Sequence, residues 1–365
     1  MNSRERIKLT LEHKEPDKIP KHDGLWGSTI ERWYKEGLPK NIEVDDYFGY
    51  EFKVGCPDTS LQFKNKIIDE TDEFIIERDH FGEVIKNFKD KSTTPQIIDS
   101  PIKDKKDWHQ LKERLRINDK RGISFKGLLL GNSFIPLKEG LKTIKDNYEK
   151  GRYMLCGMLA GFDLLQRYMG MERLCIAIAT DPQWIRGMVF ENAKFIIEMF
   201  EHMEGLGYKF DGVFLFDDLG YKNTTIISPN SYKEIIMGAD KLICDYFHNR
   251  KMKIILHSCG CVKSLIHYFI EAGIDCLQPL EVKAGMDLIE LKKSYGDNIS
   301  FMGGIDTRLF TNKDLNLIEN EIKTKFEIAK KGGGYIYHSD HSIPDNVSFS
   351  RYKEVMGFVE KYREY

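Results

Sequence analysis

The chain has 365 residues, of which 41% are hydrophobic, and its 55 Lys and Arg residues against 57 Asp and Glu residues give a formal net charge of -2. This length and apolar content suit one large globular domain or two ordinary ones, and the balanced, dispersed charge disfavours nucleic acid and anionic membranes as partners. The N-terminus alternates charged with apolar residues, and no run of about 18 apolar residues occurs, so we expect a soluble, cytoplasmic protein. The seven cysteines occur without secretory features and are therefore expected to be reduced thiols.

The first 150 residues show little regular periodicity. Residues 61–88 predict antiparallel strands joined by two tight turns, which has the character of a β-hairpin insertion in an N-terminal extension of the main fold. Residues 104–115 predict a charged covering helix. Residues 19–25 and 125–130 are two further strand candidates.

Farther along the chain, short β-branched runs alternate with longer stretches of helical period, which is the pattern of repeated βα units and predicts a parallel sheet. One clear helix places apolar side chains at i, i+3, i+4, i+7 and i+8 from Val262, and Gly273 closes it. Asp181 and Ser228, each followed by proline, mark two other helix starts. The predicted strands are residues 154–158, 212–216, 253–256, 274–277, 299–302 and 335–337, and later helices are residues 315–329 and 349–362.

These six strands and the two earlier candidates fit a closed, eight-stranded (β/α) barrel, a TIM barrel of the α/β class. We expect residues 1–365 to form a single barrel domain, with the insertion at about residues 61–88. An open, doubly wound sheet is the alternative. No G-x-G-x-x-G stretch follows a predicted strand, so nothing indicates a dinucleotide site.

The segment His257-Ser258-Cys259-Gly260 follows the apolar run 254–256, so two metal-ligating residue types stand two positions apart where a buried strand ends. Side chains alternate along an extended chain, and therefore His257 and Cys259 point the same way and can share one zinc ion. The alternative is a core histidine beside a buried free thiol, because short motifs also match by chance.

Polar residues follow five successive predicted strands, and in a barrel these strand ends form the active-site mouth. Any one of these residues could equally be a helix cap or part of a solvated loop, so the site is predicted from the convergence of all five strand ends at one rim. We assign Asp217, Asp218 and Asp306 as candidate catalytic residues. The candidate substrate-binding residues are Gln278, His338 and Asp340.

A catalytic zinc usually takes three protein ligands and leaves one position open. His257 and Cys259 supply two of them. The third is open among His341, Asp340, Asp218 and Cys261, and we favour His341. A zinc so held can stabilise a thiolate or act as a Lewis acid on a leaving group, while Asp217 or Asp218 orients a histidine or moves a proton.

The chain resembles the uroporphyrinogen decarboxylase superfamily over nearly its whole length. The resemblance rests on the order of its motifs along the chain, which are Arg4, Glu15-Pro16-Asp17-Lys18-Ile19-Pro20, His257-Ser258-Cys259-Gly260, Gly303-Gly304-Ile305-Asp306 and Ser339-Asp340-His341-Ser342-Ile343-Pro344. Members of this superfamily are (β/α) barrels, in agreement with the pattern above.

The resemblance also implies a reaction class. The decarboxylases of the superfamily carry an arginine-rich R-Q-A-G-R stretch near the N-terminus, where this chain has Pro20-Lys21-His22-Asp23-Gly24-Leu25-Trp26-Gly27. The other branch comprises zinc-dependent methyltransferases, such as those acting on methylcobamide and coenzyme M or on methoxylated compounds, whose pattern is H-x-C followed much later by a cysteine. His257 and Cys259 match the first two ligands, whereas His341 stands near the place of the third.

The leading hypothesis is therefore a zinc-dependent methyltransferase that moves a methyl group between a small-molecule donor or acceptor and a corrinoid (cobalamin) protein. This chain has no D-x-H-x-x-G corrinoid module, so the corrinoid is expected on a separate protein. A metal-free decarboxylase-like lyase and a non-catalytic member that binds the corrinoid protein are the alternatives. Dimers are common in the resembled family, and a homodimer is compatible with the sequence.

Overall fold

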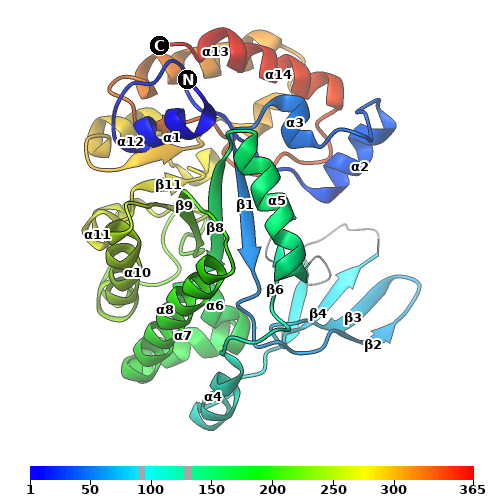
Figure 1. The fold of residues 1–365 in the computed structure, drawn as a ribbon, viewed down its shortest axis with the longest axis vertical. Helices are drawn as coiled ribbons and strands as arrows, with labels where there is room; N and C mark the ends of the chain where they lie inside the picture. Colours follow the sequence, from blue (N-terminus) through cyan, green and yellow to red (C-terminus); the bar gives the residue numbers. More distant parts are fainter. Residues whose placement is uncertain (90–94, 127–133) are drawn as a thin grey trace.

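The computed structural model describes residues 1–89, 95–126 and 134–365, and its main feature is a parallel sheet rolled into a barrel (Figure 1). Each strand pairs in parallel with the next one along the chain, beginning with β1 and β8. The barrel strands are β1 (Phe52–Pro57), β8 (Tyr153–Leu159), β9 (Gly212–Phe216), β10 (Lys253–His257), β11 (Cys276–Gln278), β12 (Ser300–Met302) and β13 (Tyr335–Ile336).

A short extended segment around Lys21 closes the barrel between β13 and β1. The amide of Tyr337 donates to the carbonyl of Pro20 at 2.8 Å, and the amide of His22 donates to the carbonyl of Tyr337 at 3.0 Å. On the other side, the amide of Glu51 donates to the carbonyl of Lys21 at 3.0 Å. This segment takes the eighth strand position, which confirms the prediction of a closed barrel, with residues 19–25 contributing to it.

Strand β1 is the barrel strand that the sequence pattern did not predict. Its sequence, Phe-Lys-Val-Gly-Cys-Pro, holds a lysine, a glycine and a proline, so it lacks the apolar run of the other strands. The strand candidate at residues 125–130 falls largely on residues 127–133, outside the described residues. Just before it, β6 (Gly122–Ser124) pairs antiparallel with the end of β1 and with β7 (Ile135–Pro136).

Helices cover the outside of the barrel, and several begin and end where the sequence predicted. Ser228 accepts a hydrogen bond from the amide of Ser231, and Gly273 closes α11 with a φ of 100°. No helix in the described part of the chain is long and apolar enough to span a membrane. The helices after β7 are α5 (Leu137–Glu149), α6 (Gly161–Met169), α7 (Met171–Thr180), α8 (Pro182–Gly205), α9 (Pro229–Ser231), η3 (Tyr232–Ile236), α10 (Met237–Asn249), η4 (Lys263–Leu265), α11 (Ile266–Ala272), η5 (Val282–Ala284), α12 (Leu288–Tyr295), η6 (Thr307–Thr311), α13 (Leu315–Ala329) and α14 (Phe349–Tyr362).

The N-terminal part adds short helices and a separate antiparallel sheet. The antiparallel strands were predicted within residues 61–88, and the sheet has one further strand, β5, beyond that stretch. Strand β1 of the barrel runs toward the side of the molecule where this sheet lies (Figure 1). Its strands are β2 (Lys66–Glu70), β3 (Phe74–Arg78), β4 (Val84–Phe88) and β5 (Gln96–Asp99). The helices are α1 (Ser3–Leu11), α2 (Gly27–Lys35), α3 (Val44–Phe48), α4 (Lys105–Leu111) and η1 (Lys112–Arg114).

Alternate residues of the barrel strands fill its interior. These side chains are buried and form a core distinct from the larger one between the strands and the outer helices, and they include Phe52, Tyr153, Leu155, Phe214, Ile255, Cys276, Met302 and Ile336. Ile7 and Leu11 of α1 belong to the same inner core. Because the strands alternate, the next inward positions beyond this core lie at the carboxyl ends, where the site is found.

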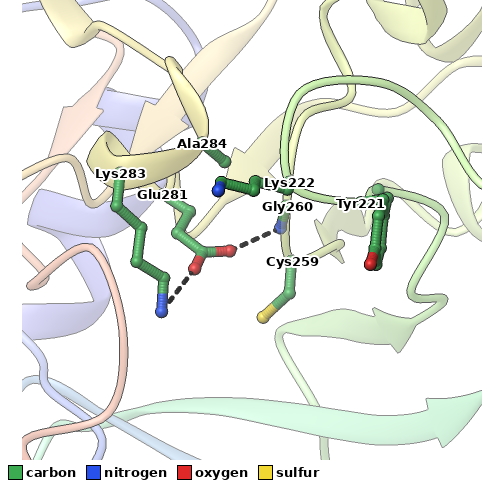
Figure 2. Close-up of a pocket in the computed structure, with 8 residues that line it drawn as sticks. Tyr221, Lys222, Cys259, Gly260, Glu281, Lys283 and Ala284 are labelled. Carbon is green, nitrogen blue, oxygen red and sulfur yellow. Dashed lines mark hydrogen bonds and ion pairs between the residues drawn. The ribbon is translucent and has the colours of Figure 1, made fainter.

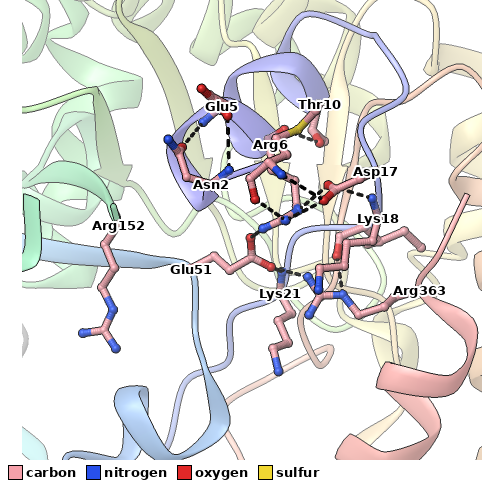
Figure 3. Close-up of polar contacts among 12 residues, drawn as sticks. Asn2, Glu5, Arg6, Thr10, Asp17, Lys18, Lys21, Glu51, Arg152 and Arg363 are labelled. Atoms are coloured by element: carbon pink, nitrogen blue, oxygen red, sulfur yellow. Dashed lines mark hydrogen bonds and ion pairs between the residues drawn. The ribbon is translucent and has the colours of Figure 1, made fainter. Parts of the chain in front are cut away.

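A buried ionic network ties the other end of the barrel to both chain termini (Figure 3). Arg6 of α1 bonds both oxygens of Asp17, at 2.7 and 2.9 Å, and pairs with Glu51 just before β1. Arg363, which follows α14, pairs with the other oxygen of Glu51. Glu51 is 3% exposed, so one carboxylate holds two arginines from opposite ends of the chain out of water.

Candidate metal site at the barrel mouth

His257 ends β10 and faces the interior of the barrel, because it is two positions beyond the inward Ile255. In the sheet register it pairs with Gln278 of β11 on one side and with Phe216 of β9 on the other. The rings of His257 and Phe216 lie 5.5 Å apart between centroids. His257 is therefore held by both neighbouring strands, above the apolar interior.

Three ligand atoms converge at this point. The Sγ of Cys259 lies 3.4 Å from Nε2 of His257, and Oδ1 of Asp218 lies 3.5 Å from the same nitrogen. The three ligand atoms all lie within 4.8 Å of one another. The amide of Cys259 also donates to Oδ1 of Asp218 at 2.8 Å, so the loop after β9 and the loop after β10 hold each other in place.

This donor set fits zinc. With bonds of about 2.0–2.3 Å and a tetrahedral arrangement, two ligand atoms of one zinc ion stand about 3.5 Å apart. The two measured separations, sulfur to nitrogen and nitrogen to oxygen, are 3.4 and 3.5 Å. Imidazole, thiolate and carboxylate are also the three groups that zinc takes in proteins. Two of the three separations thus match those around a shared ion, and the third, from sulfur to carboxylate oxygen, lies within 4.8 Å.

The hydrogen bonds around His257 set its tautomer. Nδ1 of His257 contacts Oε1 of Gln278, which only accepts, so the ring proton lies on Nδ1 and Nε2 presents its lone pair toward Cys259. Nε2 of Gln278 donates to Nε2 of His338 at 3.4 Å, and Nδ1 of His338 then donates to the carbonyl of Ser339 at 2.6 Å. Gln278 and His338 therefore orient the metal-facing imidazole from behind.

His341 lies beside Cys259 but outside the group of three converging atoms. Its imidazole interacts with the Cys259 thiol, and this hydrogen bond is the main reason that the pKa of His341 is raised. Burial raises the pKa of Cys259 to about 11, against the opposing effect of His341. The ring of Trp26 stacks near His341, with centroids 6.1 Å apart. His341 is thus placed to interact with the thiol from the far side of the mouth.

Asp217 points away from the site. It is 2% exposed, and its Oδ1 accepts from the amide of Asp163 at 2.8 Å at the start of α6. Burial, together with the negative charge of Asp240, raises its pKa well above the ordinary value. Neighbouring residues of an extended chain face opposite ways, so Asp218 faces His257 while Asp217 faces the outer helices.

Asp306 and Asp340 hold loops of the mouth. Asp306 caps η6 and forms an ion pair with Arg308 at 2.7 Å. Asp340 accepts from the amide of Val282 at 3.1 Å and from the amide and hydroxyl of Thr307 at 3.0 and 2.9 Å. The structure therefore brings His257, Cys259, Asp218 and Gln278 together, and places Asp306 and Asp340 in the surrounding loops.

Two acidic residues that the sequence analysis did not select lie next to the site. Asp163 follows β8 by four residues and lies close enough to Asp218 and His257 to feel their charges, and burial raises its pKa to about 6. Glu281 accepts from the amide of Gly260 at 2.7 Å and so supports the Cys259 loop. Both residues follow barrel strands, and this was the only signal in the sequence that could have identified them.

A cavity of about 400 Å³ opens beside Cys259 (Figure 2). It lies between the loop after β9, which contributes Tyr221 and Lys222, and the loop after β11, which contributes Glu281 and Lys283. Of the three converging residues, Cys259 belongs to the lining of this cavity, whereas His257 and Asp218 do not.

The fold and these residues define a (β/α) barrel with a candidate nitrogen, sulfur and oxygen metal site at its mouth. The family model described as "Uroporphyrinogen decarboxylase (URO-D)" matches residues 86–362. The chain belongs to this family, which confirms the resemblance seen in the motifs. No curated protein sequence matches the chain.

Two solved structures were found to be similar to the chain, and the first of them agrees with its fold. A "methyltransferase from Methanosarcina mazei" superposes with a TM-score of 0.66 at 13% identity, covering 99% of both chains. A B12-independent methionine synthase from Shewanella sp. W3-18-1 gives a TM-score of 0.44 at 9% identity, covering 95% of this chain and 93% of the other. At such low identity, the first likeness supports the shared barrel alone.

Proposed function

We propose that this protein is a zinc-dependent methyltransferase that moves a methyl group between a small molecule and a corrinoid carried by a separate protein. The observation that carries the proposal is the spacing of the Nε2 of His257, the Sγ of Cys259 and the Oδ1 of Asp218 at the barrel mouth. The barrel, which the chain shares with a methyltransferase over 99% of both chains, is compatible with it.

His257 and Cys259 would hold the metal, with Asp218 or His341 as the third ligand. The carboxylate oxygen of Asp218 belongs to the group of three converging ligand atoms, whereas the imidazole of His341 interacts with the Cys259 thiol alone. Zinc bound there would supply a Lewis acid for a substrate heteroatom. Gln278 would keep the metal-facing nitrogen of His257 unprotonated and correctly aimed.

In this reaction the methyl group passes as a cation equivalent. The bond from the methyl carbon to the substrate heteroatom would break with its electron pair left on the heteroatom, and the reduced corrinoid of the separate protein would supply the nucleophile that accepts the methyl group. Transfer in the opposite direction would reverse these roles. Asp163, whose pKa burial raises to about 6 and which interacts electrostatically with Asp218 and His257, would be the candidate to hold or supply the proton that the freed heteroatom needs.

Metal analysis of the full-length protein tests the proposal. We expect the wild type, purified without chelator, to hold about one zinc per chain, as a single three-ligand site would. His257→Ala and Cys259→Ala should lose it. His267→Ala and Cys175→Ala, which change the same residue types away from the mouth, are the matched controls and should keep it.

The third ligand is identified by two further variants, Asp218→Ala and His341→Ala, since only the true ligand should lower the zinc content. Methyl transfer is then followed with free cob(I)alamin as the acceptor, by its change in visible absorption. A wild-type protein that binds no zinc even when the metal is added, or a folded Cys259→Ala variant with full methyl transfer, would overturn the proposal.

A further inference from the structure

Asp23 is a buried carboxylate in the extended segment that closes the barrel. It is 3% exposed, and no lysine or arginine of the described residues pairs with it. Hydrogen-bond donors surround it instead. Its Oδ2 accepts from the hydroxyls of Tyr352 and Tyr337 at 2.7 and 3.3 Å, and its Oδ1 accepts from the amide of Ser339 at 3.2 Å and from the hydroxyl of the same residue. Burial raises the pKa of Asp23, whereas His338 and the donated hydrogen bonds oppose this rise and stabilise the ionised form.

Asp23 acts on one ring nitrogen of His338 in two ways. Its Oδ1 lies 3.5 Å from Nδ1 of His338, so the negative charge attracts a proton on that nitrogen. Nδ1 of His338 also donates at 2.6 Å to the carbonyl of Ser339, the residue whose amide and hydroxyl Asp23 binds. Burial lowers the pKa of His338, so this ring is neutral and carries its single proton on Nδ1.

The place of this proton decides how the amide of Gln278 is turned. With its proton on Nδ1, His338 presents a lone pair on Nε2, which accepts from Nε2 of Gln278 at 3.4 Å. The oxygen of Gln278 then faces Nδ1 of His257, and the Nε2 of His257 that faces Cys259 is left without a proton.

The opposite tautomer of His338 would reverse the whole chain of bonds. A proton on Nε2 of His338 would require the oxygen of Gln278 as its acceptor, so the amide nitrogen of Gln278 would turn toward Nδ1 of His257. The proton of His257 would then lie on Nε2. A protonated ring nitrogen has no lone pair for a metal ion, so the site would be closed to zinc.

We propose that Asp23 is a positioning residue that sets the order of protons from His338 through Gln278 to His257, and so keeps the metal-facing nitrogen free to bind. Asp23 acts through these residues and is not itself a ligand. The inference rests on the proposed function, since it assigns the metal site as the place where the order of protons matters. A purely structural role, in which Asp23 only ties its segment to α14 through Tyr352, makes different predictions.

Nitrogen NMR of the full-length, metal-free protein, labelled with ¹⁵N-histidine, shows directly which ring nitrogen carries the proton. We expect Nδ1–H for both His257 and His338, with their signals assigned by the loss of each in His257→Gln and His338→Gln. Both should shift toward Nε2–H in Asp23→Asn, which keeps the shape of the side chain but removes its charge. Asp240→Asn is the matched control and should shift neither, because Asp240 is equally buried at 4% exposure and accepts from Tyr232 at 2.6 Å. Wild-type protein with the proton of His338 on Nε2 would overturn the inference without any variant.

Zinc affinity, measured by competition with a chromophoric chelator, tests whether Asp23 acts through Gln278. Asp23→Asn should weaken zinc binding about tenfold, the lower end of the effect of an outer partner, and Asp240→Asn should not weaken it. In a Gln278→Glu background both side-chain oxygens accept, so the order of protons no longer depends on His338. Asp23→Asn should then weaken zinc binding less than about twofold. The same tenfold loss in both backgrounds would show that Asp23 acts independently of Gln278 and would overturn the inference.

The two measurements separate failure of this inference from failure of the proposed function. A change of tautomer in metal-free Asp23→Asn supports the role of Asp23 even in a protein that takes up no zinc, and the missing zinc then counts against the metal site. Zinc uptake by the wild type, with unchanged tautomers and affinity in folded Asp23→Asn, supports the metal site and overturns the role of Asp23.

Discussion

Replacement of Gln278 tests whether the hydrogen bonds behind His257 prepare the metal site. Gln278 is 4% exposed, and its Oε1 is the partner of Nδ1 of His257. Gln278→Leu keeps a branched side chain but removes both the acceptor for His257 and the donor to His338, so the ring of His257 can rotate or take the other tautomer. The loss of such a partner typically lowers metal affinity about 10- to 100-fold, which equals about 1.4–2.7 kcal/mol of binding free energy.

Gln278→Glu is the matched comparison. Its carboxylate still accepts from Nδ1 of His257, and therefore we expect the zinc affinity to stay within about threefold of the wild type, or to rise. The glutamate loses the amide donor to Nε2 of His338, so this variant also separates the two bonds that Gln278 makes.

The assay is competition for zinc against a chromophoric chelator, with circular dichroism to confirm that each variant is folded. Wild-type affinity in folded Gln278→Leu would refute the reasoning, because His257 would then need no orienting partner. An equal loss in both variants would show that the hydrogen bond from the amide of Gln278 to His338, rather than its acceptor oxygen, is what the site requires.

Three further changes are predicted from the structure. Glu51→Gln should lower the free energy of unfolding by about 3 kcal/mol and the Tm by about 4 °C in a thermal melt. The reason is that two buried arginines lose the carboxylate they share, while each keeps a second one. An unchanged Tm would contradict this. Burial raises the pKa of Glu83 from 4.5 to about 7. Between these pH values the folded state keeps a proton that the unfolded state has lost, so the free energy of unfolding should fall by up to about 3 kcal/mol as the pH rises through this window. Denaturant unfolding at several pH values should show this slope in the wild type and its loss in Glu83→Gln. Gly220→Ala should displace the Cys259 loop and lower the zinc content, since its Cβ would lie 2.3 Å from a backbone oxygen, whereas Gly187→Ala in α8 meets nothing within 4 Å and should leave the zinc content unchanged.

Local signals in the sequence were sufficient for most helices and strands. The predicted helix at residues 349–362 and the predicted strand at 212–216 have the bounds of α14 and β9. Such elements depend on apolar period, caps and chain-breaking residues within a few positions of one another. Strand β1 has no such signal, and it is a strand because Phe52 to Gly55 pair with Tyr153 to Cys156 of β8.

At the site, the two-residue spacing of His257 and Cys259 was enough to predict that their side chains lie together, although β10 ends at His257 and Cys259 stands in the loop that follows it. The sequence could not decide between Asp217 and Asp218, since both follow the same strand and face opposite sides. Only the closure of the barrel decides which side is the mouth, because strands far apart in the chain must first be placed next to one another. The pairing of His257 with Gln278, and the contact of Gln278 with His338 just after the last strand, arise from that closure alone.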